Sequence, residues 1–269
     1  MQKNNPDYDL QKAKFIEMLD DNVNISKTSD GKEFLYLVSA VLIILLGVYI
    51  FSDAISGVIV DNLSDKNRLA IEQIFKLQKS TNEDCKYPTQ LAQLNDIKNE
   101  IIRSDKTLQL KNNFPLHVIK EKDVNAAIAP DGSIFITTAL LKELKDEQTY
   151  AFILAHELGH YKHRDHLKSF GRQIIWYSVT TVLTGGHSSS GIGQITYGTG
   201  NLTELKYSKN QEYAADNYAN KYILRRYGSN KAAVDFFKYI DKKYDMPEFV
   251  HYLSTHPSPE QRIKNITHN

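Results

Sequence analysis

Hydrophobic residues form one long unbroken run near the start of the chain and shorter, periodic groups after it. The run covers residues 34–51, FLYLVSAVLIILLGVYIF, and apolar residues resume after Asp53 and continue to Val60. Eighteen helical residues extend about 27 Å, which is close to the hydrocarbon thickness of a bilayer. We therefore expect a transmembrane anchor at residues 34–60, with its core at 34–51, behind a polar N-terminal segment at 1–33.

Two other interpretations of the apolar run are a buried core helix and a cleavable signal peptide. A core helix so uniformly apolar would be unusual in a chain of 269 residues. A signal peptide begins with a short basic stretch, whereas residues 1–33 are long and polar. Lys27 and Lys32 stand before the run, and the first basic residue after it is Lys66. This bias favours a cytoplasmic N-terminus, with the large C-terminal part on the opposite, periplasmic or extracytoplasmic side.

Patterns after the anchor predict one helix-rich domain over residues 62–269 with a small β-sheet. Apolar runs at 116–119, 124–129 and 133–137 favour strands, and Pro-Asp-Gly at 130–132 favours a hairpin between the last two. Capping residues and apolar spacing predict helices at 64–77 and 89–110, from Asp146, from Ser208 to Gly228, from Ser229 or Asn230, and from Ser258. The expected fold class is therefore α+β and predominantly helical.

Composition narrows the classes of protein that fit. The formal net charge is +1 and there is no polybasic block, so nothing favours nucleic acid as a partner. A charged fraction of 24% and a hydrophobic fraction of 41% are typical of a folded protein. Cys85 is the only cysteine, which excludes an intrachain disulfide and a zinc site built from paired cysteines.

The segment His156-Glu157-Leu158-Gly159-His160 is an HExxH pattern within an otherwise apolar predicted helix. Residues four apart lie on one helical face, so both imidazoles project together, as two ligands of Zn²⁺ would. The neighbouring Glu157 can accept a proton from an attacking water without being a ligand. The alternative is a chance combination, but two histidines and an acid are costly to bury among apolar residues without a metal.

A catalytic zinc needs a third protein ligand and an open fourth position. The pattern lacks the further histidine of the HExxHxxGxxH type, so the best candidate is Glu212 in Glu212-Tyr213-Ala214-Ala215-Asp216. Asp216 shares a helical face with Glu212 and could accept the outer N–H of a ligand histidine. The alternative is two solvated acids on an amphipathic helix, and the presence of HExxH favours the metal site.

These motifs, in this order, resemble the HtpX-, Oma- and CaaX-prenyl-endopeptidase-like family of gluzincin metallopeptidases. HELGH is followed about fifty residues later by ExxxD. Residues 124–141 are similar to the family's NA…G.I.v..gLl segment, and residues 254–263 to its C-terminal HP…R element. The resemblance covers residues 114–266. It implies a zincin-like domain in which His156, His160 and Glu212 bind zinc and Glu157 is the general base and acid.

The resemblance also implies roles for two C-terminal residues. His256 would lie near the zinc and either steady the oxyanion as a catalytic residue or block the water site. The alternative is that His256-Pro257 only shapes the turn before the last helix. Arg262 would contact Asp216 or substrate, with a surface ion pair as its alternative.

A single anchor distinguishes this chain from the prenyl endopeptidases, which enclose their site in many membrane helices. A prenylated substrate is therefore not expected, and the singly anchored Oma-like or periplasmic branch fits better. That branch implies a membrane-anchored zinc metalloendopeptidase that hydrolyses unfolded or misassembled polypeptides in protein quality control, with membrane proteins as further partners. The alternative is a latent, zinc-binding, chaperone-like protein with little proteolysis, in which His256 blocks the site.

The third predicted strand is expected to bind substrate, and the alternative is an ordinary sheet edge. In zinc peptidases an edge strand beside the metal helix holds an extended segment through backbone hydrogen bonds, which here points to Ser133, Ile134, Phe135 and Ile136. Residues 185–200, rich in Gly and Ser, are expected to form either a mobile lid over the cleft or a disordered loop. His163, His166 and His187 are expected to be solvated loop or helix-end residues rather than a second metal site.

Overall fold

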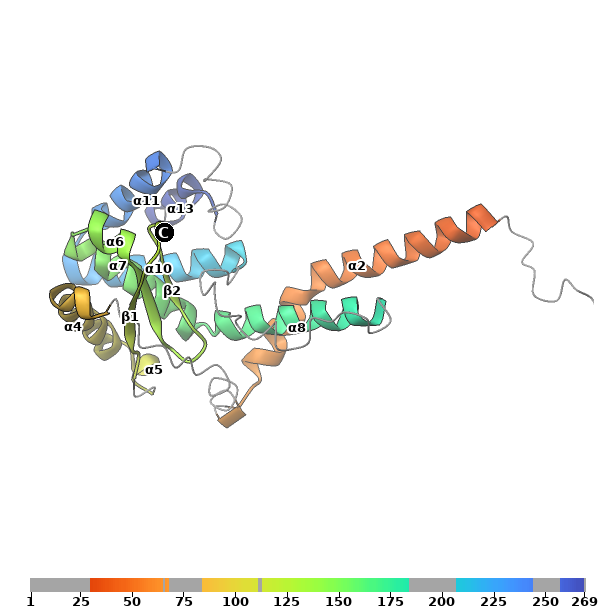
Figure 1. The fold of residues 1–269 in the computed structure, drawn as a ribbon, viewed down its shortest axis with the longest axis horizontal. Coiled ribbons are helices and arrows are strands. Elements are labelled where there is room, and N and C mark those ends of the chain that lie inside the picture. The colour runs from red at the N-terminus through yellow and green to blue at the C-terminus, as the bar shows by residue number, and fades with distance from the viewer. Residues whose placement is uncertain are drawn as a thin grey trace, which may run out of the picture. The chain divides into compact units, whose positions relative to one another are not determined.

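The computed structural model describes residues 30–64, 66–67, 84–110, 113–183, 207–243 and 257–268 (Figure 1). They belong to two compact units, Met1–Ile50 and Phe51–Asn269. Most of the helix expected at 64–77, the segment 185–200 and His256 lie outside the described residues.

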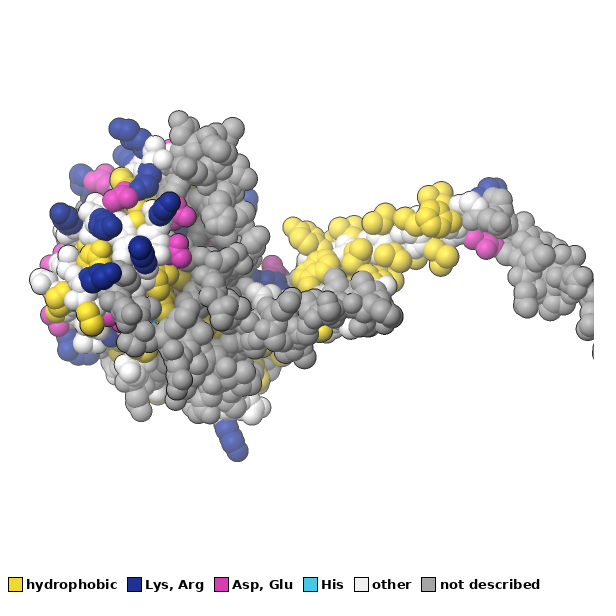
Figure 2. Space-filling model, viewed as in Figure 1, with side chains coloured by type: hydrophobic (Ala, Val, Ile, Leu, Met, Phe, Trp, Pro, Cys, Tyr) yellow, Lys and Arg dark blue, Asp and Glu magenta, His cyan; other side chains and the backbone are white. Residues whose placement is uncertain are grey.

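The apolar run lies within one helix, α2, Asp30–Asp61. Large apolar side chains are exposed along most of it, and they cover the helix in the space-filling view (Figure 2). The segment Gly31–Asp61 has the length and apolarity to cross a bilayer, and none of its most apolar window is buried in the structure. The last turns of α2 belong to the larger unit, where Ser52, Ser56 and Val60 are buried.

The sheet of the larger unit has three strands in the order β1-β3-β2: β1 is Leu116–Ile119, β2 is Ala126–Ile128 and β3 is Ile134–Thr137. β1 and β3 are parallel, and β2 and β3 are antiparallel. The predicted hairpin is confirmed, since the N–H of Gly132 donates to the carbonyl of Ala129 at 2.8 Å. Gly132 has a φ of 82°, a conformation that glycine adopts without steric cost.

The prediction that residues 133–136 form an edge strand is wrong. β3 is the central strand, because β1 pairs with its other side, and all four of its residues are buried. A continuous apolar run is typical of a strand covered on both faces, and the long-range pairing with β1 could not be read from local sequence. At the β1 edge, the carboxylate of Asp84 accepts the N–H of Val118 at 2.6 Å. The other edge strand is β2, and it packs against the HExxH helix.

Helix α7, Glu147–Lys162, lies at the centre of the larger unit, and every residue from Thr149 to Tyr161 is buried. β2 packs against it, and α10, Lys209–Tyr227, runs along it (Figure 1). A Cβ atom at Gly159 would lie only 3.3 Å from Cα of Ala215, so these two small residues allow the close approach. This packing brings the HExxH residues next to the first turn of α10.

The remaining elements surround this pair of helices. They are η1 Asp84–Lys86, α4 Pro88–Ser104, α5 Lys106–Gln109, α6 Thr138–Glu143, α8 Asp165–Leu183, α11 Lys231–Lys243 and α13 Pro259–Thr267. Helices α11 and α13 pack on each other, and α11 also contacts α7 (Figure 1). The expected α+β, predominantly helical fold is therefore confirmed.

Capping residues begin the helices where the sequence predicts them. The Asp146 carboxylate accepts the N–H of Thr149 at 2.8 Å, and Ser208 begins α10 with a capping box. The helix expected at 89–110 is instead split into α4 and α5. The cause is Asp105, whose backbone is extended and whose side chain caps α5 by accepting the N–H of Thr107.

Candidate metal centre

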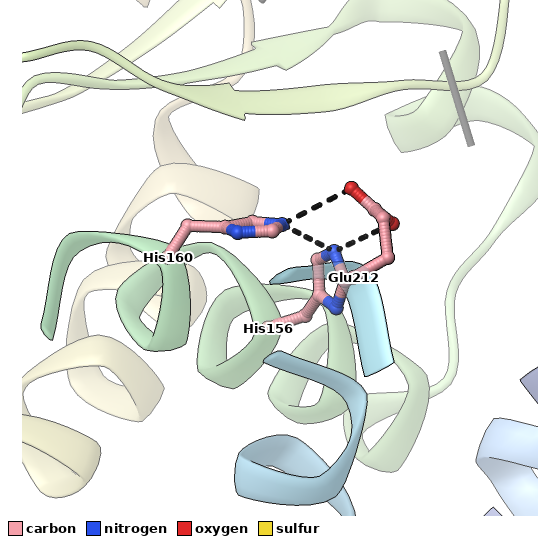
Figure 3. A group of neighbouring side chains, drawn as sticks. All are labelled: His156, His160 and Glu212. Atoms are coloured by element: carbon pink, nitrogen blue, oxygen red, sulfur yellow. Dashed lines mark hydrogen bonds and ion pairs between the residues drawn. The ribbon is translucent and has the colours of Figure 1, made fainter. Parts of the chain in front are cut away.

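Three buried side chains from two helices converge on one point (Figure 3). His156 and His160 project from the same face of α7, and Glu212 reaches them from the first turn of α10. The Nε2 atoms of the two histidines are 3.1 Å apart. Glu212 Oε1 lies 3.3 Å from Nε2 of His160, and Oε2 lies 3.7 Å from Nε2 of His156.

The spacing of these atoms fits one zinc ion. Ligand atoms about 2.1 Å from a tetrahedral zinc lie roughly 3.4 Å from one another, and the three observed separations fall on both sides of that value. Two imidazole nitrogens and one carboxylate are also the donor set of many catalytic zinc sites. His156, His160 and Glu212 could therefore hold Zn²⁺ and leave a fourth position open.

Each histidine is oriented by a carboxylate at its other ring nitrogen. Nδ1 of His156 lies 3.0 Å from Oδ1 of Asp216, and Nδ1 of His160 lies 2.9 Å from Oδ2 of Asp165. A carboxylate at Nδ1 favours the tautomer that is protonated there, which leaves Nε2 with a lone pair for a metal. Asp216 lies where the sequence predicts it.

Asp165 has no counterpart in the sequence prediction. It is the first residue of α8, and the chain reaches it through Arg164, whose φ of 59° turns the backbone sharply after α7. The sequence did contain a signal for this contact. Asp165 follows His160 by only five residues, and a tight turn after a helix can bring the next residues back against its last turn. The prediction of a solvated His166 is also wrong: the residue is fully buried, and its ring stacks on Tyr161 at 5.0 Å.

Gln211 forms hydrogen bonds that help to position two of the three candidate ligands, His160 and Glu212. Its Nε2 donates to Oδ1 of Asp165 at 3.1 Å, and its Oε1 accepts the backbone N–H of Ser208 at 2.8 Å. The first contact holds the carboxylate that orients His160. The second completes the capping box at the start of α10, the helix whose first turn carries Glu212.

Arg262 enters the same site from α13 and is buried. Its Nε and Nη2 donate to the two carboxylate oxygens of Asp216 at 2.8 and 2.6 Å, and its guanidinium lies 4.5 Å from the ring centre of Phe237. The contact with Asp216 is the one that the resemblance implies, although it is a buried pair and not a surface one. The C-terminal helix is thereby linked to the orientation of His156.

The two histidines differ in their affinity for a proton. Burial and the positive charge of Arg262 lower the pKa of His156 to about 4. Burial alone would also lower the pKa of His160, but hydrogen bonds to Asp165 and Glu212 outweigh it and raise the value to about 10. Before a metal binds, His156 is neutral at physiological pH and His160 carries the proton.

Glu157 lies beside this group and is also buried. Burial raises the pKa of its carboxyl to about 7, partly opposed by the positive charge of His160 and by a backbone hydrogen bond from Ile128. A carboxyl with a pKa near neutrality can both accept and return a proton. The bond from Ile128 also connects Glu157 to β2, the edge strand that faces the metal helix.

A family model for peptidase family M48 matches residues 88–269. The chain belongs to that family. The match spans the sheet, α7, α10 and α13, and thus every residue of the convergent group. The metallopeptidase family predicted from HExxH and ExxxD is confirmed.

Proteins similar to this chain are metalloendopeptidases by name. The chain is 25% identical to "Metalloendopeptidase OMA1, mitochondrial" of Bos taurus over 167 residues, which is 57% of this chain and 32% of that protein. It is 27% identical to "Mitochondrial metalloendopeptidase OMA1" of Schizosaccharomyces pombe over 157 residues, 57% of this chain and 45% of that protein. The chain thus spans less than half the length of these relatives. The Oma-like resemblance is confirmed.

A narrow pocket opens next to Glu157 in this M48 chain. Its walls are mostly apolar and come from the residues that lead into β2, from the first residue of β2, and from α6, α7, α11 and α13. The lining residues are Val124, Asn125, Ala126, Leu140, Phe152, Ile153, His156, Glu157, Phe236, Ile240 and Arg262. An apolar pocket that ends at a candidate base and a candidate ligand has the arrangement expected of a side-chain subsite.

Proposed function

We propose that this M48 chain is a zinc metalloendopeptidase in which His156, His160 and Glu212 bind the metal and Glu157 is the general base and acid. The observation that carries the proposal is the convergence of three buried donor atoms within 4.8 Å of one another. Their support by Asp216 and Asp165 is consistent with it, since carboxylates behind ligand histidines are usual in zinc sites.

A bound zinc ion would supply Lewis-acid activation of water and of the substrate carbonyl. Glu157 takes the proton from the attacking water and returns it to the leaving amine. Burial raises the pKa of its carboxyl to about 7, a value that suits both proton transfers. Asp165 and Asp216 favour the imidazole tautomers protonated at Nδ1, which leave a lone pair on each Nε2 for a metal. His256 remains a proposed oxyanion stabiliser on the basis of the resemblance alone.

The proposed substrate is an extended polypeptide segment that lies along β2. β2 is the edge strand beside α7, and its Ile128 already directs a backbone hydrogen bond to Glu157. A segment paired with this edge would present its peptide bond to Glu157 and one side chain to the apolar pocket. Backbone recognition of this kind favours unfolded or misassembled proteins, as in protein quality control.

The same proposal includes anchoring by α2, with a cytoplasmic N-terminus and the peptidase unit on the opposite side. Support comes from the exposed apolar surface of Gly31–Asp61 and from the lysines that precede it in the sequence.

The test is cleavage of an unfolded model protein by the full-length chain, with zinc content measured in the same sample. We expect zinc near one per chain, and we expect Glu157→Gln to keep the zinc and lose about 10²–10⁴-fold in turnover. Glu147→Gln is the matched control, because Glu147 is exposed in the first turn of the same helix.

Retained cleavage in the Glu157→Gln variant would contradict the assignment of the base. Zinc without cleavage by the unchanged chain would favour the second candidate, a latent chaperone-like protein whose site is blocked by His256. Replacing His256 by Ala would then restore cleavage, whereas in a working peptidase the same change would lower it.

A further inference from the structure

Helices α2 and α8 each carry one charged residue within an apolar stretch, and these two residues pair with each other. Asp53 is the only charged residue between positions 34 and 60, and Arg172 is the only one between positions 169 and 183. Nη1 of Arg172 lies 2.9 Å from Oδ1 of Asp53. Both residues belong to the larger unit.

Further contacts align the two helices over two turns. Nζ of Lys168 lies 3.0 Å from Oδ1 of Asp61, and a Cβ atom at Gly171 would lie 3.1 Å from Cβ of Ser56. Residue numbers increase along α8 while those of its partners in α2 decrease, so the two helices are antiparallel here. Small residues at the closest approach are typical of helices that pair in membranes.

The outer surfaces of this pair are apolar and exposed. Among the large hydrophobic side chains that are exposed, the last turns of α2 contribute four and α8 contributes three. They are Phe51, Ile55, Val58 and Ile59 on α2 and Ile174, Val182 and Leu183 on α8. Contiguous apolar surface is uncommon on a protein that meets only water, and it marks an interaction site.

We propose that α8 lies in lipid beside α2, so that the chain enters the membrane as an antiparallel helix pair. This rests on the proposed anchoring by α2. The apolar side chains of α8 lie beside the last turns of α2, and α2 is a helix able to cross a bilayer, which makes lipid the occupant. The charges match as well, because an acid and a base within apolar segments are tolerated in lipid when they neutralise each other.

The depth of α8 follows from its length. Residues 173–183 are uncharged and extend about 16 Å as a helix, roughly half of the hydrocarbon core. α8 therefore dips into one leaflet and does not span the bilayer. Its first residue is Asp165, the partner of His160, so the metal centre lies close to the membrane surface. Substrate segments near the bilayer would be within reach.

The only tryptophan of the chain, Trp176, lies on α8 and reports on this surface without labelling. The experiment reconstitutes the full-length chain in phosphatidylcholine vesicles with brominated or ordinary acyl chains. Flotation measures binding to the vesicles, and tryptophan emission measures contact with bromine. The matched control moves the reporter to the exposed surface of α10, with Trp176→Phe and Leu224→Trp combined in one chain.

We expect the chain to float with the vesicles and Trp176 to lose most of its fluorescence when the acyl chains are brominated. The tryptophan relocated to α10 should keep its fluorescence in the same vesicles. Arg172→Gln should reduce the quenching, and the double exchange Asp53→Arg with Arg172→Asp should restore it. Flotation with water-like, unquenched Trp176 emission would overturn the role of α8 and leave the α2 anchor intact. Blue-shifted but unquenched emission would also overturn it, since protein and not lipid would then cover α8. A chain that does not float would overturn both proposals.

Discussion

Oδ2 of Asp165 lies 2.9 Å from Nδ1 of His160, and both residues are buried. The bond joins the last turn of α7 to the first residue of α8, and it fixes the ring so that Nε2 faces Glu212. The candidate metal centre therefore depends on a residue outside HExxH and ExxxD.

Asp165→Asn is expected to lower zinc affinity by about 10–100-fold, the usual cost of losing a carboxylate behind a ligand histidine. At neutral pH the measured loss in zinc affinity will be smaller. Without Asp165 the pKa of His160 falls, so less free energy is needed to remove its proton before zinc binds. Competition with a fluorescent chelator measures the affinity. Asp235→Asn is the control, since Asp235 is exposed, lies on α11 and forms an ion pair with exposed Lys231 on the same helix. Unchanged affinity in Asp165→Asn would show that Asp165 does not orient the ligand.

Local sequence was sufficient for the part of the site that lies on single helices. His156 and His160 are one turn apart, so helix geometry alone places them on one face. Glu212 and Asp216 also share a face, but only the family pattern joins their helix to α7. Asp165 was missed because its contact is made across a turn whose sharpness depends on the positive φ of Arg164.

The sheet shows the same limit. The hairpin of β2 and β3 is local and was predicted from Pro-Asp-Gly at 130–132, whereas the parallel pairing of β1 with β3 is set by tertiary packing. That pairing moves β3 from the edge to the centre. The strand beside α7 at the edge of the sheet is β2, and the backbone of its Ile128 hydrogen-bonds to Glu157.

Zinc uptake by the metal-free protein is expected to release about one proton per ion at pH 8. The pKa of His160 is about 10, so its imidazole is protonated at this pH and must lose the proton to become a ligand. His156, with a pKa of about 4, is already neutral and contributes none. Affinity should therefore rise about tenfold per pH unit from pH 8 toward 10. Calorimetry in buffers of different ionisation enthalpy measures the release. Binding with no proton release would mean that His160 is neutral in the metal-free state.

Replacing Arg262 is expected to destabilise the fold as well as the site. In Arg262→Met the Asp216 carboxylate stays buried without its bidentate partner, which typically costs about 3–5 kcal/mol in the free energy of unfolding. Denaturant unfolding measures this. Adding Asp216→Asn should recover part of the loss, because the unpaired charge is removed. Lys264→Ala on the same helix should change little, since the Lys264 side chain is exposed and pairs with Glu260, which is exposed as well. Equal losses in the single and double variants would mean that packing on Phe237, and not the ion pair, holds Arg262.

The pocket beside Glu157 is expected to select the substrate side chain next to the cleaved bond. Ile240 of α11 lines it and is buried, so Ile240→Phe would fill space that a large apolar substrate side chain would occupy. We expect the preference to move toward small side chains, with discrimination changing by about 10–200-fold, the range for small changes in volume in an apolar pocket. Mass spectrometry of a peptide library cleaved by both forms measures the shift. Lys238→Ala, exposed on the same helix, is the control. If Ile240→Phe kept the original preference, as the control should, the substrate side chain would not bind in this pocket. The proposed binding of substrate along β2 would then be wrong.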